Sequence, residues 1–417
     1  MKRFLILAMA LSLLIVAFAT PISAQEEEVT IEIYITGLWE DALNYFNDDL
    51  FPAFEEEHPG VNLEMISGGW GDFDASVAGW ITTGEGPDIV YLGSEYAATY
   101  GHLLHDMDPY LAEWEDLEQF LPFAIDTVTF DGHMRGVPLL MSPRPIFYRS
   151  DLAEGEYPMT FTDALAFYEA NSFVEEGAMV EMGFMDIGAG LFDAQEFIGY
   201  IWSAGGELHY EDGTSAFDSD AVAEVLQYMY DRRRIMLPDE ETAGLPPIEG
   251  WPIASDVVVS GIFPMWNMPP TDNELWDVIE MGPYPAGEEG EPIVQVFIDW
   301  LSVPAYVPEE KLELIAEFLT FALNQENSVT LGSRLGFTPT RQDAWETLRE
   351  NPVWDQLLDM TVEYGRSFSD IRASAELRPL IVEQVQLFLT DQQSLEDTQM
   401  NLKEEYDGIL EDNGYLD

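Results

Sequence analysis

Aromatic side chains stand beside carboxylate, amide or guanidinium side chains at several places in this 417-residue sequence, mostly near the ends of predicted strands. Such neighbours suit a ligand with apolar faces and many hydroxyl groups, because a ring can stack on the apolar face while planar polar groups make paired hydrogen bonds. We therefore expect a binding site without catalytic residues. Its expected members are Trp39, Glu40, Trp70, Asp72, Glu95, Arg144, Trp202, Trp266, Asn267, Asp299 and Trp300.

Each of these residues also has a simpler interpretation. The chain has 11 tryptophans, and a tryptophan is often part of a hydrophobic core. With 79 aspartates and glutamates, an acidic neighbour such as Glu40 or Asp72 is expected by chance alone. Arg144 differs, because Pro143 and Pro145 hold its backbone on both sides. We expect it to contact the ligand or to act in closure of the site, with a surface ion pair as the alternative.

Patterns typical of enzymes and metal sites are weak. The sequence contains no G-x-S-x-G turn, Walker loop or H-E-x-x-H motif. His102 and His105 have the spacing of a minimal metal site, but we expect solvated histidines at a helix end. The basic run from Arg232 to Arg234 is expected to be a solvated face paired with acids, with docking on a membrane permease as the alternative. We expect no metal and no cofactor.

Strands and helices that would position these residues alternate along the first 92 residues. Residues 29–35 alternate apolar and polar side chains, which predicts a strand. Residues 41–57 repeat apolar side chains every three or four positions, which predicts a helix that Pro59 and Gly60 end. A strand over 61–66, a helix over 76–83 and a strand over 88–92 follow. This order predicts an α/β fold with a parallel sheet covered by helices.

Two segments of this region carry a family resemblance. The sequence FPAFEEEHPG over residues 51–60, followed by TTGEGPDIVYL over residues 82–92, resembles the opening of sugar-type extracellular solute-binding proteins, the maltose-binding-protein-like components of ABC importers. Later matches keep the family order, including W-x-x-G-G over residues 202–206 and G-x-x-P-x-R over residues 336–341. The resemblance implies capture of a ligand rather than catalysis.

The same resemblance implies a two-lobe periplasmic binding protein fold of type II, each lobe a mostly parallel sheet flanked by helices. We expect residues 25–140 and 297–335 in lobe 1, and residues 141–296 and 336–417 in lobe 2. Hinge crossings are expected near residues 139–145, 294–300 and 337–341. A chain of this length also predicts two domains on size alone.

The N-terminus predicts secretion. Lys2 and Arg3, an apolar run and a small-residue site ending at Ala24 form a signal peptide over residues 1–24, with a membrane anchor as the alternative. The sequence has no cysteine, which excludes disulfides and a lipobox. We expect a soluble, secreted or periplasmic protein.

The formal net charge of −63 argues against nucleic acid as a partner. Only three lysines occur, and a carboxylate-rich, lysine-poor surface suits high salt, with an acidic medium as the alternative. The expected function is capture of a small-molecule carbohydrate, by a monomer, for the permease subunits of an ABC importer. A polyol or compatible solute is the alternative ligand. A secreted glycoside-active enzyme is the alternative of another class, since paired carboxylates can serve a glycosidase.

Overall fold

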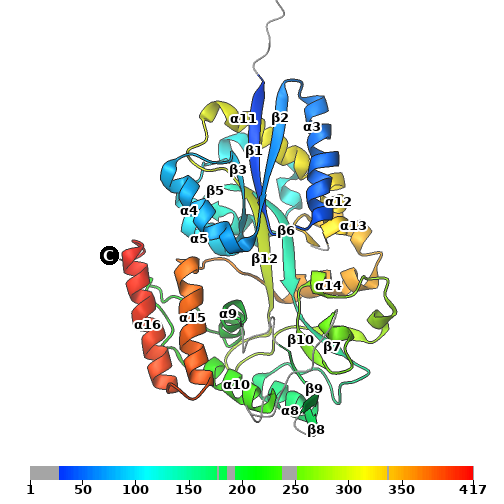
Figure 1. The fold of residues 1–417 in the computed structure, drawn as a ribbon, viewed down its shortest axis with the longest axis vertical. Helices are drawn as coiled ribbons and strands as arrows, with labels where there is room; N and C mark the ends of the chain where they lie inside the picture. The colour runs from blue at the N-terminus through cyan, green and yellow to red at the C-terminus, as the bar shows by residue number, and fades with distance from the viewer. Residues whose placement is uncertain (1–27, 176–177, 186–192, 237–250, 336–337, 417) are drawn as a thin grey trace, which may run out of the picture.

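The computed structural model describes residues 28–175, 178–185, 193–236, 251–335 and 338–416. The chain forms two lobes, one above the other in Figure 1, and two long strands run from one lobe into the other. This arrangement confirms the predicted α/β fold class. The predicted signal peptide, residues 1–24, lies outside the described residues.

The upper lobe is built on a seven-stranded mixed sheet with the order β13-β6-β12-β3-β1-β2, to which β14 adds by pairing with β12. Strand β1 pairs in parallel with β2 and β3, as predicted, whereas β12 runs antiparallel to both β3 and β6. In β1, Ile31 and Ile33 are buried while Glu32 is exposed, so the alternation of the sequence sets the buried face. The strands are β1 (Val29–Thr36), β2 (Val61–Gly68), β3 (Ile89–Gly93), β6 (Gly136–Arg144), β12 (Val294–Ser302), β13 (Thr338–Pro339) and β14 (Gly365–Ser367).

The helix predicted over residues 41–57 consists of three helical segments. A π-helical turn, Phe46–Leu50, joins α2 (Glu40–Tyr45) to α3 (Phe51–Glu57), and Phe46, Phe51 and Phe54 are buried against the sheet. Helix α4 (Phe73–Thr83) starts three residues earlier than predicted and ends at Gly84, which has a φ of 68°. The other helices of this lobe are α5 (Ala97–Tyr100), α6 (Asp108–Leu111), α7 (Pro122–Thr127), α11 (Glu309–Ala322) and α12 (Gln325–Leu335).

The lower lobe contains a three-stranded sheet with the order β10-β7-β11. Both pairs are antiparallel, which differs from the expected mostly parallel sheet. The reason is that β7 continues directly from β6, and β10 and β11 both run back along it. The strands are β7 (Ile146–Arg149), β10 (Ser260–Ile262) and β11 (Ile279–Gly282), and β8 (Phe173–Glu175) forms a short hairpin with β9 (Ala178–Glu181). A second short hairpin, β4 (Thr129–Phe130) with β5 (His133–Met134), belongs to the upper lobe (Figure 1).

Helices surround this small sheet and fill the lower lobe. Thr160 caps the N-terminus of helix α8, because its side-chain oxygen accepts a hydrogen bond of 3.2 Å from the backbone N–H of Asp163. Two long C-terminal helices run side by side (Figure 1). The helices are α8 (Phe161–Ala170), α9 (Ala194–Ser203), α10 (Asp220–Met236), α15 (Ser374–Leu389) and α16 (Leu395–Asp412), with α13 (Trp345–Leu348) and α14 (Pro352–Tyr364) near the junction of the lobes.

Two strand connections link the lobes where crossings are expected. Strand β6 ends at Arg144 in the large sheet, and β7 starts at Ile146 in the small one. Strand β12 covers residues 294–302 and lies between β6 and β3. Of the third expected crossing, Phe337 lies outside the described residues, and Thr338 and Pro339 pair with β6. The lobe boundaries themselves remain a prediction.

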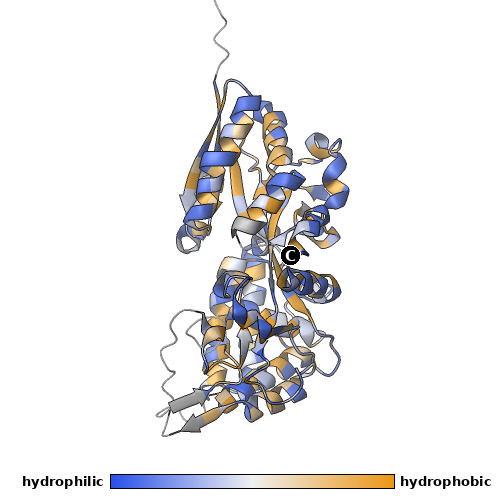
Figure 2. Ribbon diagram, turned by 90° about the vertical axis from the view of Figure 1, so that its right-hand side faces the viewer, coloured by the Kyte–Doolittle hydropathy of each residue, from blue (hydrophilic) through white to orange (hydrophobic). Residues whose placement is uncertain are grey.

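Each lobe has its own hydrophobic core. Figure 2 shows hydrophobic residues along the strands and on the inward faces of helices, with hydrophilic residues toward the outside. One buried cluster surrounds β1 and β3, and a separate cluster packs α8, α9 and α10 against α15 and α16. Within the described ranges, no helix combines the length and the apolar character that crossing a membrane requires.

Candidate functional site

A cavity of about 740 Å³ lies where the two lobes meet, and we call it the interlobe cleft. Its size falls within the range of small-molecule pockets, about 300–1,000 Å³. The upper lobe contributes the ends of β1 and β3 and the start of α4, and the lower lobe contributes the first turns of α9 and α15. Polar groups converge on such a cleft because it lies at the carboxyl ends of parallel strands.

Two tryptophans of the upper lobe border the interlobe cleft. Trp39 is half-buried after β1, and Trp70 is 42% exposed after β2. The indole of Trp70 lies against Gly37, which has a φ of 70°. A Cβ at Gly37 would lie 2.0 Å from the indole nitrogen, so glycine leaves the space that the ring occupies. Phe73 supports Trp70 with a ring-centroid distance of 5.1 Å.

Arg144 forms part of the wall between the lobes. Its guanidinium carbon lies 3.8 Å from the centre of the Phe297 ring, and its Nη1 donates a 2.8 Å hydrogen bond to Oε1 of Gln195. Burial lowers the pKa of Arg144. The stacked ring and the α9 residue hold the guanidinium in one orientation, toward the cavity.

Two carboxyl groups, Glu95 and Asp299, lie in the interlobe cleft and are 7% and 8% exposed. Burial raises the pKa of Asp299 to about 7, and the charge of Glu95 adds to this rise. Burial also raises the pKa of Glu95, while Arg378 and Arg144 oppose the rise. Nη1 of Arg378, on α15, lies 4.0 Å from Oε1 of Glu95 and so joins the two lobes.

Several polar atoms of cleft residues are buried and lack a hydrogen-bond partner among the described residues. They are Oγ1 of Thr36, Oδ1 of Asp74, Nε of Arg144 and Oγ of Ser374. Buried polar atoms are normally paired, because an unpaired one costs about 1–3 kcal/mol. These four atoms include both donors and acceptors and come from both lobes, so they favour a ligand rich in hydroxyl groups.

The interlobe cleft brings together five of the eleven residues expected from the sequence: Trp39, Trp70, Glu95, Arg144 and Asp299. Glu40 and Asp72 are exposed at the first turns that follow Trp39 and Trp70, outside the cavity lining. Asn267 is exposed elsewhere on the lower lobe. The side chain of Trp266 lies outside what the structure describes.

Trp202 and Trp300 lie away from the interlobe cleft, contrary to expectation. Trp300 is 1% exposed, and its Nε1 donates a 3.3 Å hydrogen bond to the carbonyl of Gly93. Phe297 and Asp299 face the cleft from β12, so the next side chain points to the other face of the sheet. Trp202 is 5% exposed and packs against Phe368 and beneath the guanidinium of Arg366. In this structure both tryptophans are buried against other residues and neither lines the interlobe cleft.

Other cleft residues were not anticipated from the sequence: Thr36, Asp74, Tyr91, Ser142, Asp193, Gln195, Phe297, Ser374 and Arg378. Asp193 could have been identified from the sequence, because aspartate is a preferred residue at the N-cap of a helix. In the structure it caps α9 by accepting a 2.7 Å hydrogen bond from the backbone N–H of Gln195. No sequence pattern marks Ser374 and Arg378 as cleft residues. Helix α15 reaches the cleft only through the tertiary fold, more than 300 residues after Trp70.

The basic run on α10 differs from expectation at its first residue. Arg232 is buried, and its Nη1 lies 2.7 Å from Oε1 of Glu196, which is also buried. The same nitrogen donates a 3.0 Å hydrogen bond to the hydroxyl of Tyr200. Arg234 pairs on the surface with Asp391, as expected. The basic run is therefore only partly solvated, because it begins in the core at Arg232 and ends on the surface at Arg234.

Of the two histidines considered from the sequence, His105 contacts a backbone carbonyl. Nε2 of His105 lies 2.8 Å from the carbonyl oxygen of Val307 and ties that loop to the chain after β12.

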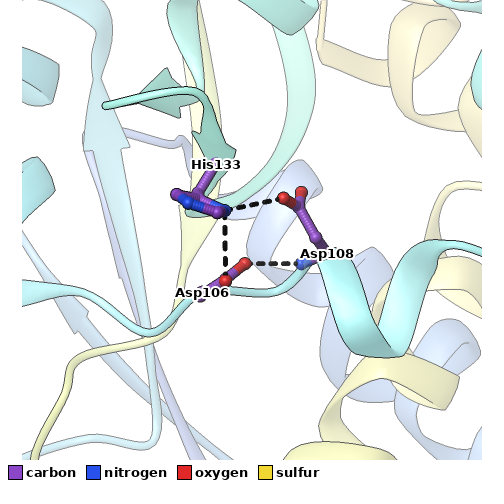
Figure 3. Close-up of side chains that lie close together, drawn as sticks. All are labelled: Asp106, Asp108 and His133. Carbon is purple, nitrogen blue, oxygen red and sulfur yellow. Dashed lines mark hydrogen bonds and ion pairs between the residues drawn. The ribbon is translucent and has the colours of Figure 1, made fainter.

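Another histidine meets two carboxylates, as Figure 3 shows. Nδ1 of His133 lies 3.0 Å from Oδ2 of Asp108 and 3.2 Å from Oδ2 of Asp106. These three residues have the donor types of a metal site, but all are partly or fully exposed. Because one imidazole nitrogen faces both carboxylates, the arrangement is that of a surface hydrogen-bond cluster that joins the β4–β5 hairpin to the start of α6.

Comparison with known proteins gives consistent results. A family model described as bacterial extracellular solute-binding protein matches residues 37–329. An uncharacterized ABC transporter extracellular-binding protein of Pyrococcus horikoshii is 24% identical over 353 residues, which cover 81% of this chain and 79% of that protein. An arabinooligosaccharide-binding protein of Bacillus subtilis is 24% identical over 372 residues, 82% of this chain and 81% of that protein.

Solved structures show the same fold. Maltose-bound MalE3 of T. maritima aligns with a TM-score of 0.72 and 20% sequence identity, covering 92% of this chain and all of the other.

Proposed function

The chain belongs to the bacterial extracellular solute-binding protein family, and we propose that it captures a carbohydrate in the interlobe cleft and presents it to the permease of an ABC importer. The polar atoms and aromatic rings that meet in the cleft carry this proposal. Trp39 and Trp70 offer ring surface, and four buried polar atoms of the cleft lack partners in the described chain. A sugar has apolar C–H faces that stack on indole and hydroxyl groups that hydrogen-bond to such atoms.

The two lobes make this capture a closing motion. Contacts from both lobes to one ligand stabilise the closed state over the open one, and a permease can then recognise that state. Arg144 and Gln195 face the ligand from the hinge and the lower lobe, while Trp39, Trp70 and Glu95 face it from the upper lobe. The names of relatives support a sugar as the ligand, because the Bacillus subtilis protein is an arabinooligosaccharide-binding protein.

Polyols are the second ligand class that the cleft favours, because they offer the same hydroxyl groups without a ring face. The affinity for a polyol should depend less on Trp39 and Trp70 than the affinity for a sugar, and this difference distinguishes the two ligand classes. A glycoside-active enzyme is the competing function of another class, and buried Glu95 and Asp299 are the carboxyl groups it would use.

The test uses the chain from residue 25 onward, screened by thermal shift against neutral sugars, oligosaccharides and polyols in molar salt. A carbohydrate that raises the melting temperature is then titrated by calorimetry. We expect saturable one-site binding and no release of products from the bound glycan over hours. Turnover of the glycan would favour the enzyme, and the absence of binding to every member of the panel would contradict carbohydrate capture.

A further inference from the structure

Glu95 and Asp299 lie side by side in the interlobe cleft. Asp299 of β12 pairs with Gly93 of β3. The side chain of Glu95 folds back over the same glycine, where its Oε2 lies 2.6 Å from the position that a Cβ on Gly93 would take. A glycine at position 93 therefore leaves the space in which a second carboxyl group lies next to Asp299.

The charges around this pair do not neutralise both carboxylates. Asp74 of α4 and Asp193 before α9 also line the cleft, against two guanidinium groups, Arg144 of β6 and Arg378 of α15. Arg378 is 4.0 Å from Glu95, and Arg144 is shared with Gln195.

Two tyrosines complete the surroundings of the pair. Tyr91 of β3 hydrogen-bonds Asp299, and Tyr96 lies beside Asp74. A tyrosine hydroxyl supplies one donor and no charge. Four carboxylates of the cleft therefore face two cations.

Two adjacent carboxyl groups out of water are difficult to ionise together, so such a pair retains one proton at a higher pH than either group would alone. The pKa of Asp299, about 7, follows from burial and the charge of Glu95. Because the groups interact, the proton belongs to the pair rather than to one residue.

We propose that the Glu95–Asp299 pair holds one proton near neutral pH and that hydroxyl groups of the bound carbohydrate replace it as hydrogen-bond donors, so that capture releases the proton to solvent. This inference rests on the proposed function. The pair is already buried in the ligand-free chain, so a ligand adds little desolvation and mainly adds donors. Hydrogen bonds to a carboxylate favour its charged form. Affinity should therefore weaken as pH falls.

The test measures the affinity of the carbohydrate found in the screen from about pH 5.5 to about pH 8.5, in buffers of different ionisation enthalpy. We expect Kd to rise by up to about tenfold per pH unit below about pH 7, with release of up to about one proton per ligand. Asp299→Asn should remove this dependence. Glu346→Gln, an exposed change on α13, is the matched control and should retain it.

A constant affinity in the wild-type protein, or one that strengthens on acidification, would overturn the proposal. The two failures are distinct: binding without pH dependence contradicts only the proton release, whereas no binding at all contradicts the carbohydrate function on which it rests.

Thermal stability of the ligand-free protein gives a second measurement. A carboxyl group whose pKa is raised on folding keeps its proton in the folded state after the unfolded chain has lost it. As pH rises from about 4 to about 7, the free energy of unfolding of the wild-type protein should therefore decrease relative to that of Asp299→Asn. Parallel curves for the two proteins would show that the pair holds no extra proton and would overturn the proposal without any ligand.

Discussion

At the scale of single residues, we expect opposite effects from replacing Trp70 and Trp300: loss of affinity at the first position and loss of stability at the second. Trp70 borders the interlobe cleft with an exposed ring, so Trp70→Ala should remove stacking area of some tens of Å², worth on the order of 1–2 kcal/mol. Binding should weaken by roughly ten- to thirtyfold with a small change in melting temperature. Trp300→Ala instead empties a core position and should cost about 3–5 kcal/mol of unfolding free energy. Calorimetry and denaturant titration on both variants measure this contrast.

Gly37→Ala is the control for the position of the ring, because its methyl group would collide with the indole of Trp70. It should weaken binding in the same direction as Trp70→Ala. Wild-type affinity in both variants would show that Trp70 does not touch the ligand.

The sequence shows which residue types could bind a ligand, but it does not show on which face of a strand each side chain lies. Asp299 and Trp300 are adjacent and equally suited to bind a sugar, yet only Asp299 faces the cavity. A one-residue difference decides the face of a strand, and composition around β12 does not reveal it because all nine of its residues are buried.

At the scale of elements, the pairing of α10 with α9 depends on a buried ion pair. Arg232→Ala leaves the carboxylate of Glu196 buried without its guanidinium partner and should destabilise the protein by about 3–5 kcal/mol. Replacing both residues, Arg232→Met with Glu196→Leu, should recover most of that loss, because a packed apolar pair avoids the desolvation penalty. Arg234→Ala, at the exposed end of the same helix, is the control and should leave the melting temperature unchanged. Equal effects of Arg232→Ala and Arg234→Ala in urea titrations would contradict this.

Elements with strong local signals could be predicted from sequence, and those set by distant pairing could not. Strands β1, β2 and β3 appear where alternation and β-branched residues place them. The antiparallel direction of β10 and β11 depends on how a chain of more than a hundred residues returns to β7, which no local pattern records. For the same reason no local pattern identifies the start of α15 as a wall of the cleft.

At the scale of the whole molecule, the two lobes should move toward each other when a ligand binds. Ligand contacts on both walls of the cleft favour closure, and we expect the connecting strands β6 and β12 to bend without losing secondary structure. We expect a smaller radius of gyration at saturation and an unchanged circular dichroism spectrum. Small-angle scattering with and without the carbohydrate measures this, and an identical radius at saturation would contradict closure.

The net charge of −63 leads to the last prediction, which concerns the medium in which this protein is stable. Carboxylates on a folded surface repel one another more than in the expanded unfolded chain, and this repulsion acts against folding. Its range shrinks from roughly 30 Å at 0.01 M salt to about 3 Å at 1 M. Melting temperature at neutral pH should therefore rise steadily as sodium chloride reaches the molar range. Adaptation to an acidic medium predicts instead that acidification, which removes the same repulsion by protonation, stabilises the protein more than salt does at neutral pH. Melting curves over a grid of salt and pH separate the two, and a flat salt response would exclude adaptation to high salt.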